Sequence, residues 1–408
     1  MASERVQVEG HIIDSLTLAK VLDTILSAGC DYVIEEVTIG RSADDMSRAL
    51  VEIQAPDDVV LESLLSELQV HGANRTSTVD ATLVTADTDG VLPDGFYSTT
   101  NLPTAVRIDG HWVPVATPEM DCGVAVDRGD DTASARTVPM HRVEAGDRIV
   151  VGHEGVRVTV PARVGGPGSQ FEFMNSDVSS EKPKARLVAD VAARIRAAKE
   201  AGERVLLVAG PALIHTGTGP HLAALVRGGW IDVLFAGNGF ATHDIESNVL
   251  GTSLGVSLEL GSGVEHGHSN HLRVINEVRR QGSIAAAVES GYISGGVMYE
   301  CVKAGVPFVL GGSVRDDGPL PDVHTDVVKA ADTMRANLDG VGVALMLATT
   351  LHAIATGNLL SATVQTFCVD INQAVVTKLA DRGSHQALGI VTDVGLFVEE
   401  LRQQLVPA

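Results

Sequence analysis

The chain has 408 residues, a formal net charge of −22, 45% apolar residues, 42 glycines and only 3% aromatic residues. This length and composition predict two or three domains of the α/β class, and the acidic balance argues against nucleic acid as a partner. The four cysteines are far apart and form no C-x-x-C pair, which indicates neither a zinc site nor a disulfide framework and fits a reducing cytoplasm.

Residues 1–80 predict a small ferredoxin-like α+β domain. Its opening residues, MASERVQVEG, place charges where a signal peptide would need an apolar core. Alternating and helical apolar spacing then predict strands near 5–13, 31–40 and 47–55 and helices near 15–29 and 57–72. This β-α-β-β-α order is typical of modules that bind small ligands or pair subunits, and the domain holds no catalytic constellation.

Residues 81–164 predict a small β-rich module, and residues 165–408 a Rossmann-like domain. The first is rich in turn residues between short alternating runs. The second alternates helices with buried strands, which predicts a doubly wound parallel sheet with ligand sites at the carboxyl ends of its strands. Strands are expected at 204–210, 231–237, 307–313 and 364–370, and helices at 184–202, 219–230, 274–291 and after residue 393.

An uncharged stretch, residues 340–369, raises the question of a membrane span. Its first part, GVGVALMLATTLHAIATGNLL, has about the length of a spanning helix. Polar residues such as Thr349, Thr350 and His352 interrupt it. We therefore expect a long buried helix of the α/β core.

Asp370 ends a predicted strand, where dinucleotide-binding folds often hold a ribose. The usual glycine fingerprint is missing upstream, so other backbone and hydroxyl groups would have to hold a pyrophosphate. Polar residues also follow the other strands: His215 and Thr216, then Asn238 to Glu246, then Arg315 to Asp317. Because strand ends of a parallel sheet share one edge, these loops are expected to converge.

Each candidate also has a structural interpretation. Asn175, Ser179 and Ser180 can cap a helix, and single histidines such as His215 and His243 are more often structural than catalytic. His266, His268 and His271 lack the spacing of H-E-x-x-H, so no metal is expected. Cys122 and Cys301 have no base that the sequence places within reach, and neither is expected to be a nucleophile.

Long motifs make the chain recognisable: EMDCGVAVD, NSDVSSEKP, AGNGFATHDIE, MYECVKAGVPFVLGGSVRDDGPLPD and FCVDINQAVVTKLADRGS. Together they resemble the LOR/SDH bifunctional enzyme conserved-region family, which includes archaeal-type ornithine cyclodeaminases and the carboxyl-terminal part of cyanobacterial arginine dihydrolases. The resemblance implies NAD as cofactor and conversion of L-ornithine to L-proline and ammonia by internal hydride transfer. A cytoplasmic homo-oligomer, dimer or tetramer, is expected.

More distantly, the large domain is similar to deoxyhypusine synthase, another NAD enzyme. That likeness implies that residues at the strand ends surround the dinucleotide. The reaction also requires carboxylates that hold the two ammonium groups of ornithine and a group that transfers protons. The candidate catalytic groups are Asp316, Asp317, Asp244, Glu300 and His352, with His243 as an alternative to His352. The candidate cofactor-binding residues are Asn175, Ser176, Ser179, Gly210, Thr216, Asn238, Asp370, Asn372 and Asp393.

Two other functions stay open. The family label suggests saccharopine or lysine-oxoglutarate chemistry, or another amino-acid dehydrogenase, which would change the nicotinamide absorbance stoichiometrically. A non-catalytic sensor is the second alternative, with an amino acid bound by the leading module and NAD by the large domain. Lysine and ornithine differ by one methylene, which is worth only about 1–3 kcal/mol in a pocket.

Overall fold

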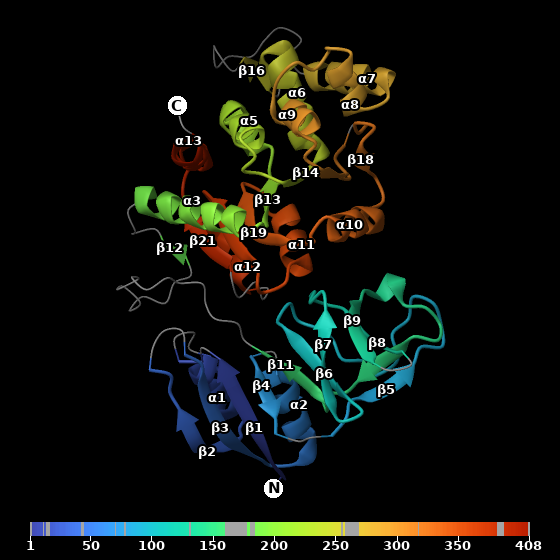
Figure 1. Ribbon diagram of the computed structural model, residues 1–408, viewed down its shortest axis with the longest axis vertical. Helices are drawn as coiled ribbons and strands as arrows, with labels where there is room; N and C mark the ends of the chain where they lie inside the picture. The colour runs from blue at the N-terminus through green and yellow to red at the C-terminus, as the bar shows by residue number, and fades with distance from the viewer. Residues whose placement is uncertain are drawn as a thin grey trace. The chain divides into compact units, whose positions relative to one another are not determined.

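The computed structural model divides into two compact units (Figure 1). Unit 1 comprises Met1–Met174 and Asn358–Thr363, and unit 2 comprises Asn175–Gly357 and Val364–Ala408. The structure describes residues 2–10, 12–13, 17–41, 45–69, 71–76, 79–129, 132–159, 178–179, 184–253, 256–257, 269–316, 318–381 and 387–406.

Unit 1 opens with a four-stranded antiparallel sheet. Its elements are β1 (Ala2–Gly10), α1 (Thr17–Ser27), β2 (Asp31–Thr38), β3 (Ser47–Ala55), α2 (Asp58–Gln69) and β4 (Ala73–Arg75). The strand order β2-β3-β1-β4 confirms the ferredoxin-like prediction. Alternate residues such as Val6, Val8 and Val51 are fully buried, while Arg5, Gln7 and Arg48 between them are not. Because side chains alternate between the two faces of the sheet, one face is buried and the other has no helix packed over it.

A seven-stranded sheet completes unit 1. Its elements are β5 (Thr82–Thr85), β6 (Thr104–Ile108), β7 (His111–Ala116), β8 (Gly123–Arg128), β9 (Ala133–Val138), the 3-10 helix Met140–Arg142, β10 (Arg148–Val151) and β11 (Val156–Val158). The strand order is β11-β6-β7-β9-β8-β10-β5, and only β7 and β9 pair in parallel among these strands. The segment Asn358–Thr363 joins this unit, where Ala362 enters the core and its amide donates to the carbonyl of Asn101 at 2.8 Å.

Unit 2 is built on an eight-stranded parallel sheet in the described residues. Its order is β12-β21-β20-β19-β13-β14-β17-β18, and its six longer strands follow the 3-2-1-4-5-6 order of dinucleotide-binding sheets. The strands are β12 (Val178–Ser179), β13 (Arg204–Ala209), β14 (Val233–Gly237), β17 (Phe308–Gly311), β18 (Val323–His324), β19 (Val341–Leu347), β20 (Gln365–Asp370) and β21 (Ala387–Val391), and β15 (Thr252–Ser253) and β16 (Val256–Ser257) form a separate hairpin.

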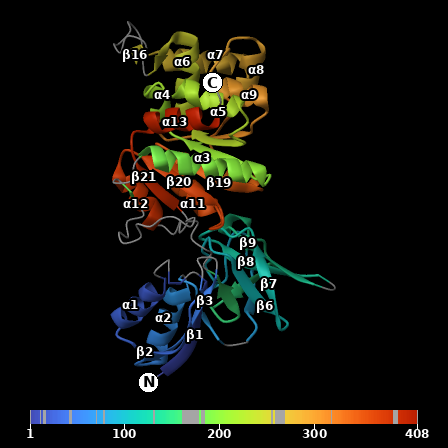
Figure 2. The same cartoon turned by 60° about the vertical axis from the view of Figure 1, so that its left-hand side comes forward.

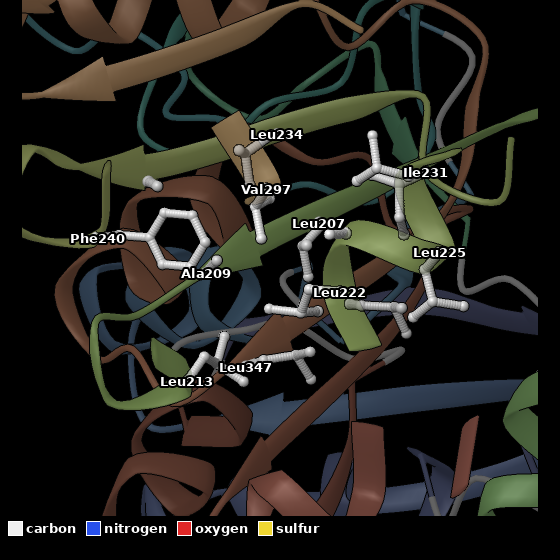
Figure 3. Packing of buried hydrophobic residues seen from close by; sticks show 14 of the residues in the cluster. Leu207, Ala209, Leu213, Leu222, Leu225, Ile231, Leu234, Phe240, Val297 and Leu347 are labelled. Carbon is white, nitrogen blue, oxygen red and sulfur yellow. The ribbon is translucent and has the colours of Figure 1, made fainter. Parts of the chain in front are cut away.

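Helices fill the connections of this sheet. They are α3 (Lys184–Glu200), α4 (Ala212–His215), α5 (Gly219–Arg227), α6 (Asn238–Leu250), α7 (Asn270–Gln281), α8 (Ile284–Glu289), α9 (Val297–Ala304), α10 (Val327–Ala336), α11 (Leu351–Leu359), α12 (Gln373–Asp381) and α13 (Val394–Leu405). Helix α13 packs beside α3 and α5 over one face of the sheet (Figure 2). There Leu207 and Leu347 of the central strands meet Leu222 and Phe240 (Figure 3). The Rossmann-like prediction is confirmed.

Two helix predictions are wrong. The uncharged stretch is not one helix: its first part is the central strand β19, followed by α11. Residues of β19 face apolar neighbours on both sides, so the run shows no alternation, and an apolar run of this kind suits a buried strand as well as a helix. The predicted helix at 274–291 breaks at Gly282, whose φ of 95° ends α7 before Ser283 caps α8. Within the described residues, no helix is long and apolar enough to cross a membrane.

Candidate functional site at the carboxyl edge of the parallel sheet

The strand order reverses between β13 and β19, and ligands of open α/β sheets bind at such a switch point. Gly210 follows β13, and its amide donates to the carbonyl of Leu347 at 2.9 Å. A Cβ atom placed on Gly210 would lie 1.7 Å from the carbonyl oxygen of Ala348, which itself has a positive φ of 50°. Only glycine fits there, because the segments that follow β13 and β19 approach each other closely at the switch point.

Two threonines and an aspartate lie together at the starts of α5 and α13. The hydroxyls of Thr216 and Thr218 are 2.8 Å apart in the turn after α4. A Cβ atom placed on Gly395 would lie 3.1 Å from Asp393 Oδ1 and 3.2 Å from Thr218 Oγ1. Asp393 caps α13 by accepting the amide of Leu396 at 2.9 Å. The structure thus brings the predicted residues Thr216 and Asp393 to one place, with hydroxyl and carboxylate groups suited to a sugar.

His352 lies at the start of α11 against the ends of two strands. A Cβ atom placed on Gly311, the last residue of β17, would lie 3.0 Å from His352 Nε2. A Cβ atom placed on Gly237, the last residue of β14, would lie 3.2 Å from His352 Cε1. Burial lowers the pKa of His352 from its usual 6.5, so the imidazole is neutral near neutral pH and can accept a proton.

The lowered pKa of His352 predicts a loss of stability in acid. Protonation favours the unfolded chain, so the contribution of the neutral ring is present above pH 6.5 and is lost as the pH falls through the lower pKa of the folded state. We expect the free energy of unfolding to fall more steeply as the pH drops below 6.5 in the natural protein than in His352→Gln. Urea titrations at several pH values measure both slopes, and equal slopes would contradict the burial of this ring.

Asn238 and Asp316 organise the loop that follows β17. Asn238 is buried at the start of α6, and its Oδ1 accepts the amide of Leu320 at 3.0 Å and the hydroxyl of Thr242 at 3.3 Å. Asp316 turns back on its own loop, where Oδ2 accepts the amide of Ser313 at 2.8 Å. Both predicted residues therefore lie after neighbouring strands and already carry structural hydrogen bonds. Asp317 lies outside the described residues.

Asp370 and Asn372 shape the turn from β20 into α12. Asp370 Oδ1 accepts the amide of Asn372 at 2.8 Å, and Asn372 Oδ1 accepts the amide of Ala374 at 3.0 Å. These bonds are typical of Asx turns at a helix start. Asp370 thus stands at the carboxyl edge of the sheet, as predicted from the sequence. The predicted residues Asn175 and Ser176 and the side chain of Ser179 lie outside the described part of the chain.

Asp244 and Glu300 have partners away from the strand ends. Asp244 is fully buried in α6 and accepts the amides of Val297 at 3.0 Å and Met298 at 2.8 Å, at the start of α9. Burial raises the pKa of Asp244 to about 6, and the two amide bonds oppose this rise. Glu300 of α9 binds Arg227 Nε of α5 at 3.0 Å. As catalytic groups both remain predictions, while their observed contacts hold α9.

Replacing Asp244 by alanine separates these two roles. The change leaves two buried amides without an acceptor, and we expect the free energy of unfolding to fall by about 2 kcal/mol or more. Asp244→Asn keeps one acceptor oxygen and should lose less. Urea unfolding followed by circular dichroism measures the effect. Unchanged stability together with lost turnover in Asp244→Ala would assign the carboxylate to catalysis instead.

A buried polar network joins α4, α6, β15 and α7. Glu246 is fully buried, contacts His243 Nδ1 at 2.9 Å and accepts the hydroxyl of Thr252 at 2.8 Å. The His215 and His243 rings have centroids 4.8 Å apart, and burial lowers the pKa of His215. The remaining bonds of the network join His215 Nδ1 to Ser253 Oγ at 2.7 Å and Asn270 Nδ2 to Thr252 Oγ1 at 2.9 Å.

His215, His243 and Glu246 stand out in the sequence as polar residues after two strands, but their network could not be predicted from it. His243 and Glu246 are an i, i+3 pair on one helix, but the other partners lie 6 to 38 positions apart, and no spacing rule links those. Among the described residues, no group of three His, Cys, Asp or Glu side chains is arranged to hold a metal ion. His266 and His268 lie outside that part of the chain.

The chain is similar to known proteins over nearly its whole length. Three family models match in succession: the LOR/SDH bifunctional enzyme conserved region over residues 3–102, the first region of the arginine dihydrolase ArgZ-like carboxyl-terminal part over 103–188, and its Rossmann fold over 189–401. An ornithine cyclodeaminase of Methanothermobacter thermautotrophicus is 49% identical, with 99% of this chain and 98% of the relative covered.

The chain belongs to this ornithine cyclodeaminase family.

Solved structures of the family share its fold. The structure of a conserved putative LOR/SDH protein from Methanococcus maripaludis S2 is 46% identical with a TM-score of 0.75, covering 80% of this chain and 98% of the other. The ternary complex of AgrE with ornithine and NAD⁺ is 43% identical with a TM-score of 0.54, covering 99% of this chain and 57% of that longer chain. The family resemblance inferred from the long motifs is confirmed.

Proposed function

We propose that this chain is an NAD-dependent ornithine cyclodeaminase, which converts L-ornithine to L-proline and ammonia. The observation that carries the proposal is the 49% identity to an ornithine cyclodeaminase over 99% of the chain. A relative that is 43% identical binds ornithine and NAD⁺ in one ternary complex. The dehydrogenase alternative has only the LOR/SDH name of the leading region in its favour.

The carboxyl edge of the parallel sheet fits a dinucleotide. Gly210 lets the backbone after β13 approach the Ala348 carbonyl after β19, at the switch point where such sheets bind their ligands. Thr216 and Asp393 offer an exposed hydroxyl and an exposed carboxylate, and the buried hydroxyl of Thr218 lies 2.8 Å from that of Thr216. We propose these four residues as the described part of the NAD site, with Asp370 and Asn372 at the neighbouring strand end. When bound, NAD supplies an acceptor and then a donor of hydride, so no net oxidation occurs.

The residues of the chain hold the substrate and move protons. His352 is neutral near neutral pH and lies over the ends of β14 and β17, where it can take a proton from the δ-ammonium of ornithine. The freed amine can then close the five-membered ring at Cα, with departure of the α-amino nitrogen as ammonia. Asp316, beside the same strand ends, is the proposed carboxylate partner of an ammonium group, together with Asp317.

Mass analysis of the purified protein tests the proposal. We expect denatured protein to release NAD(H), and native protein to release proline from ornithine without an added oxidant. A dehydrogenase would instead change the nicotinamide absorbance in proportion to product. Folded protein that binds NAD and an amino acid but releases no product would be a sensor, and the proposal would fail.

The location and assembly of the enzyme are part of the proposal. The four cysteines are buried thiols, which supports a reducing cytoplasm. We propose a homo-oligomer, dimer or tetramer. Light scattering on the purified chain tests the assembly, and a monomer at micromolar concentration would contradict it.

A further inference from the structure

Unit 1 contains a pocket of about 530 Å³, and none of its described lining residues is a candidate active-site residue. Its floor is the open face of the ferredoxin-like sheet, where Arg5, Gln7 and Glu9 of β1 lie beside Arg48 and Leu50 of β3. Residues of β7 and β11 form its wall, and β11 lies beside β4 (Figure 1). The pocket therefore belongs to unit 1 alone.

The positive charge of this pocket is unusual for the chain, which has 52 acidic and 30 basic residues. Arg5 is paired with Glu35 at 2.9 Å, and Arg75 with Glu62 and with Glu154. Arg48 and Arg157 form no ion pair within the described part of the chain, although both line the pocket. Two guanidinium groups are thus available to an anion, and their planar donors suit a carboxylate.

Hydrogen bonds and stacking hold the wall in place. The side chain of Asn74 makes two hydrogen bonds with the backbone of Val158. Nδ2 donates to the Val158 carbonyl at 2.7 Å, and Oδ1 accepts from the Val158 amide at 2.7 Å. Arg157 lies over the ring of Trp112, with Cζ 4.1 Å from the ring centroid. A guanidinium ordered on an aromatic face loses less freedom when it binds a ligand. This wall therefore presents a fixed cation to the pocket.

The floor adds an acidic group. Glu9 lies directly opposite Arg48 in the register of β1 and β3, and its Oε2 accepts the Nε2 donor of Gln7 at 2.8 Å. A pocket with two available guanidinium groups and one carboxylate complements a ligand with two carboxylates and one ammonium. We infer that this pocket binds an acidic α-amino acid. The inference does not rest on the proposed function, because every described lining residue of the pocket belongs to unit 1.

Tryptophan fluorescence tests this site directly. The chain has two tryptophans, and Trp230 is partly buried against the core of unit 2, so Trp230→Phe leaves Trp112 in the pocket wall as the reporter. We expect L-glutamate to change this fluorescence with saturation, and Arg48→Ala and Arg157→Ala each to weaken binding by about tenfold or more. Arg128→Ala, which removes an exposed arginine paired with Asp109, is the matched control and should leave the affinity unchanged.

Other probes separate the possible ligands. Glutarate carries both carboxylates without the ammonium and should bind more weakly than L-glutamate, and Glu9→Gln should remove that difference. Equilibrium dialysis of the natural protein with labelled L-glutamate repeats the test if Trp230→Phe does not fold. Saturation by inorganic phosphate alone, no saturation up to about 10 mM L-glutamate, or binding that persists in both arginine variants would overturn the inference.

Discussion

Replacing Gly210 by alanine is expected to abolish retention of NAD(H) and to lower the free energy of unfolding by about 3 kcal/mol or more. The added Cβ would lie 1.7 Å from the carbonyl oxygen of Ala348 and 3.2 Å from Cβ of Thr349. The first of these is a backbone atom, so no side-chain rotation can relieve the clash. The ends of β13 and β19 would have to separate at the switch point of the sheet.

Gly239→Ala is the matched control for this change. Gly239 lies in α6, just after the neighbouring strand β14, and a Cβ atom there would meet nothing within 4 Å. Alanine inside a helix should raise stability by about 0.5–1 kcal/mol and leave the cofactor in place. The nucleotide released on denaturation and urea unfolding of both variants provide the comparison. If Gly210→Ala retains as much NAD(H) as Gly239→Ala, the cofactor does not lie at the switch point.

The fold followed from the sequence wherever one periodicity dominated. The ferredoxin-like order was visible because helices and half-buried strands alternate clearly in residues 1–80, and the observed strand order agrees. The helix prediction for residues 340–369 failed because β19 is buried on both faces, so apolar and polar residues do not alternate along it. The β-branched residues Val341 and Val343, and the short apolar segment of seven residues before Thr349 and Thr350, were the available indications of a strand.

The site could be predicted only as far as the strand ends. Asp370 and the segment after β13 lie at the carboxyl edge because strand direction alone fixes that edge. Asp244 was grouped with them because NGFATHDIE was interpreted as a loop, whereas α6 begins directly at Asn238. That helix directs the Asp244 carboxylate to the start of α9. Local sequence does not show which helix a buried carboxylate will meet.

Long-range contacts form the parts of the site that could not be predicted from the sequence. The approach of Gly210 to Ala348 joins residues 138 positions apart, and the position of His352 depends on two glycines that end separate strands. These glycines are not part of a known fingerprint, so their role appears only when the strands are assembled. The switch point and the neutral imidazole thus lie on one sheet edge, which is where hydride and proton transfer to one substrate must be combined.

Replacing His352 by glutamine is expected to lower turnover of ornithine by about 10²- to 10⁴-fold while NAD(H) is retained. This expectation rests on the proposed function. Glutamine can still hydrogen-bond but cannot take a proton, so a proton-transfer role is lost and the packing against Gly237 and Gly311 is largely kept. Proline release under saturating ornithine measures the effect. His221→Gln on α5 is the control, because that helix covers the sheet away from α11 and should retain full turnover.

The pH profile of turnover decides whether His352 acts as the base. Its pKa lies below 6.5 because of burial, so the natural enzyme should lose activity as the pH falls through this lower value. In His352→Gln the residual activity should lack this acidic limb, since no group at that position titrates. A variant with full turnover, or with the same acidic limb as the natural enzyme, would assign proton transfer to another group, and His243 beside the buried Glu246 is then the next residue to replace.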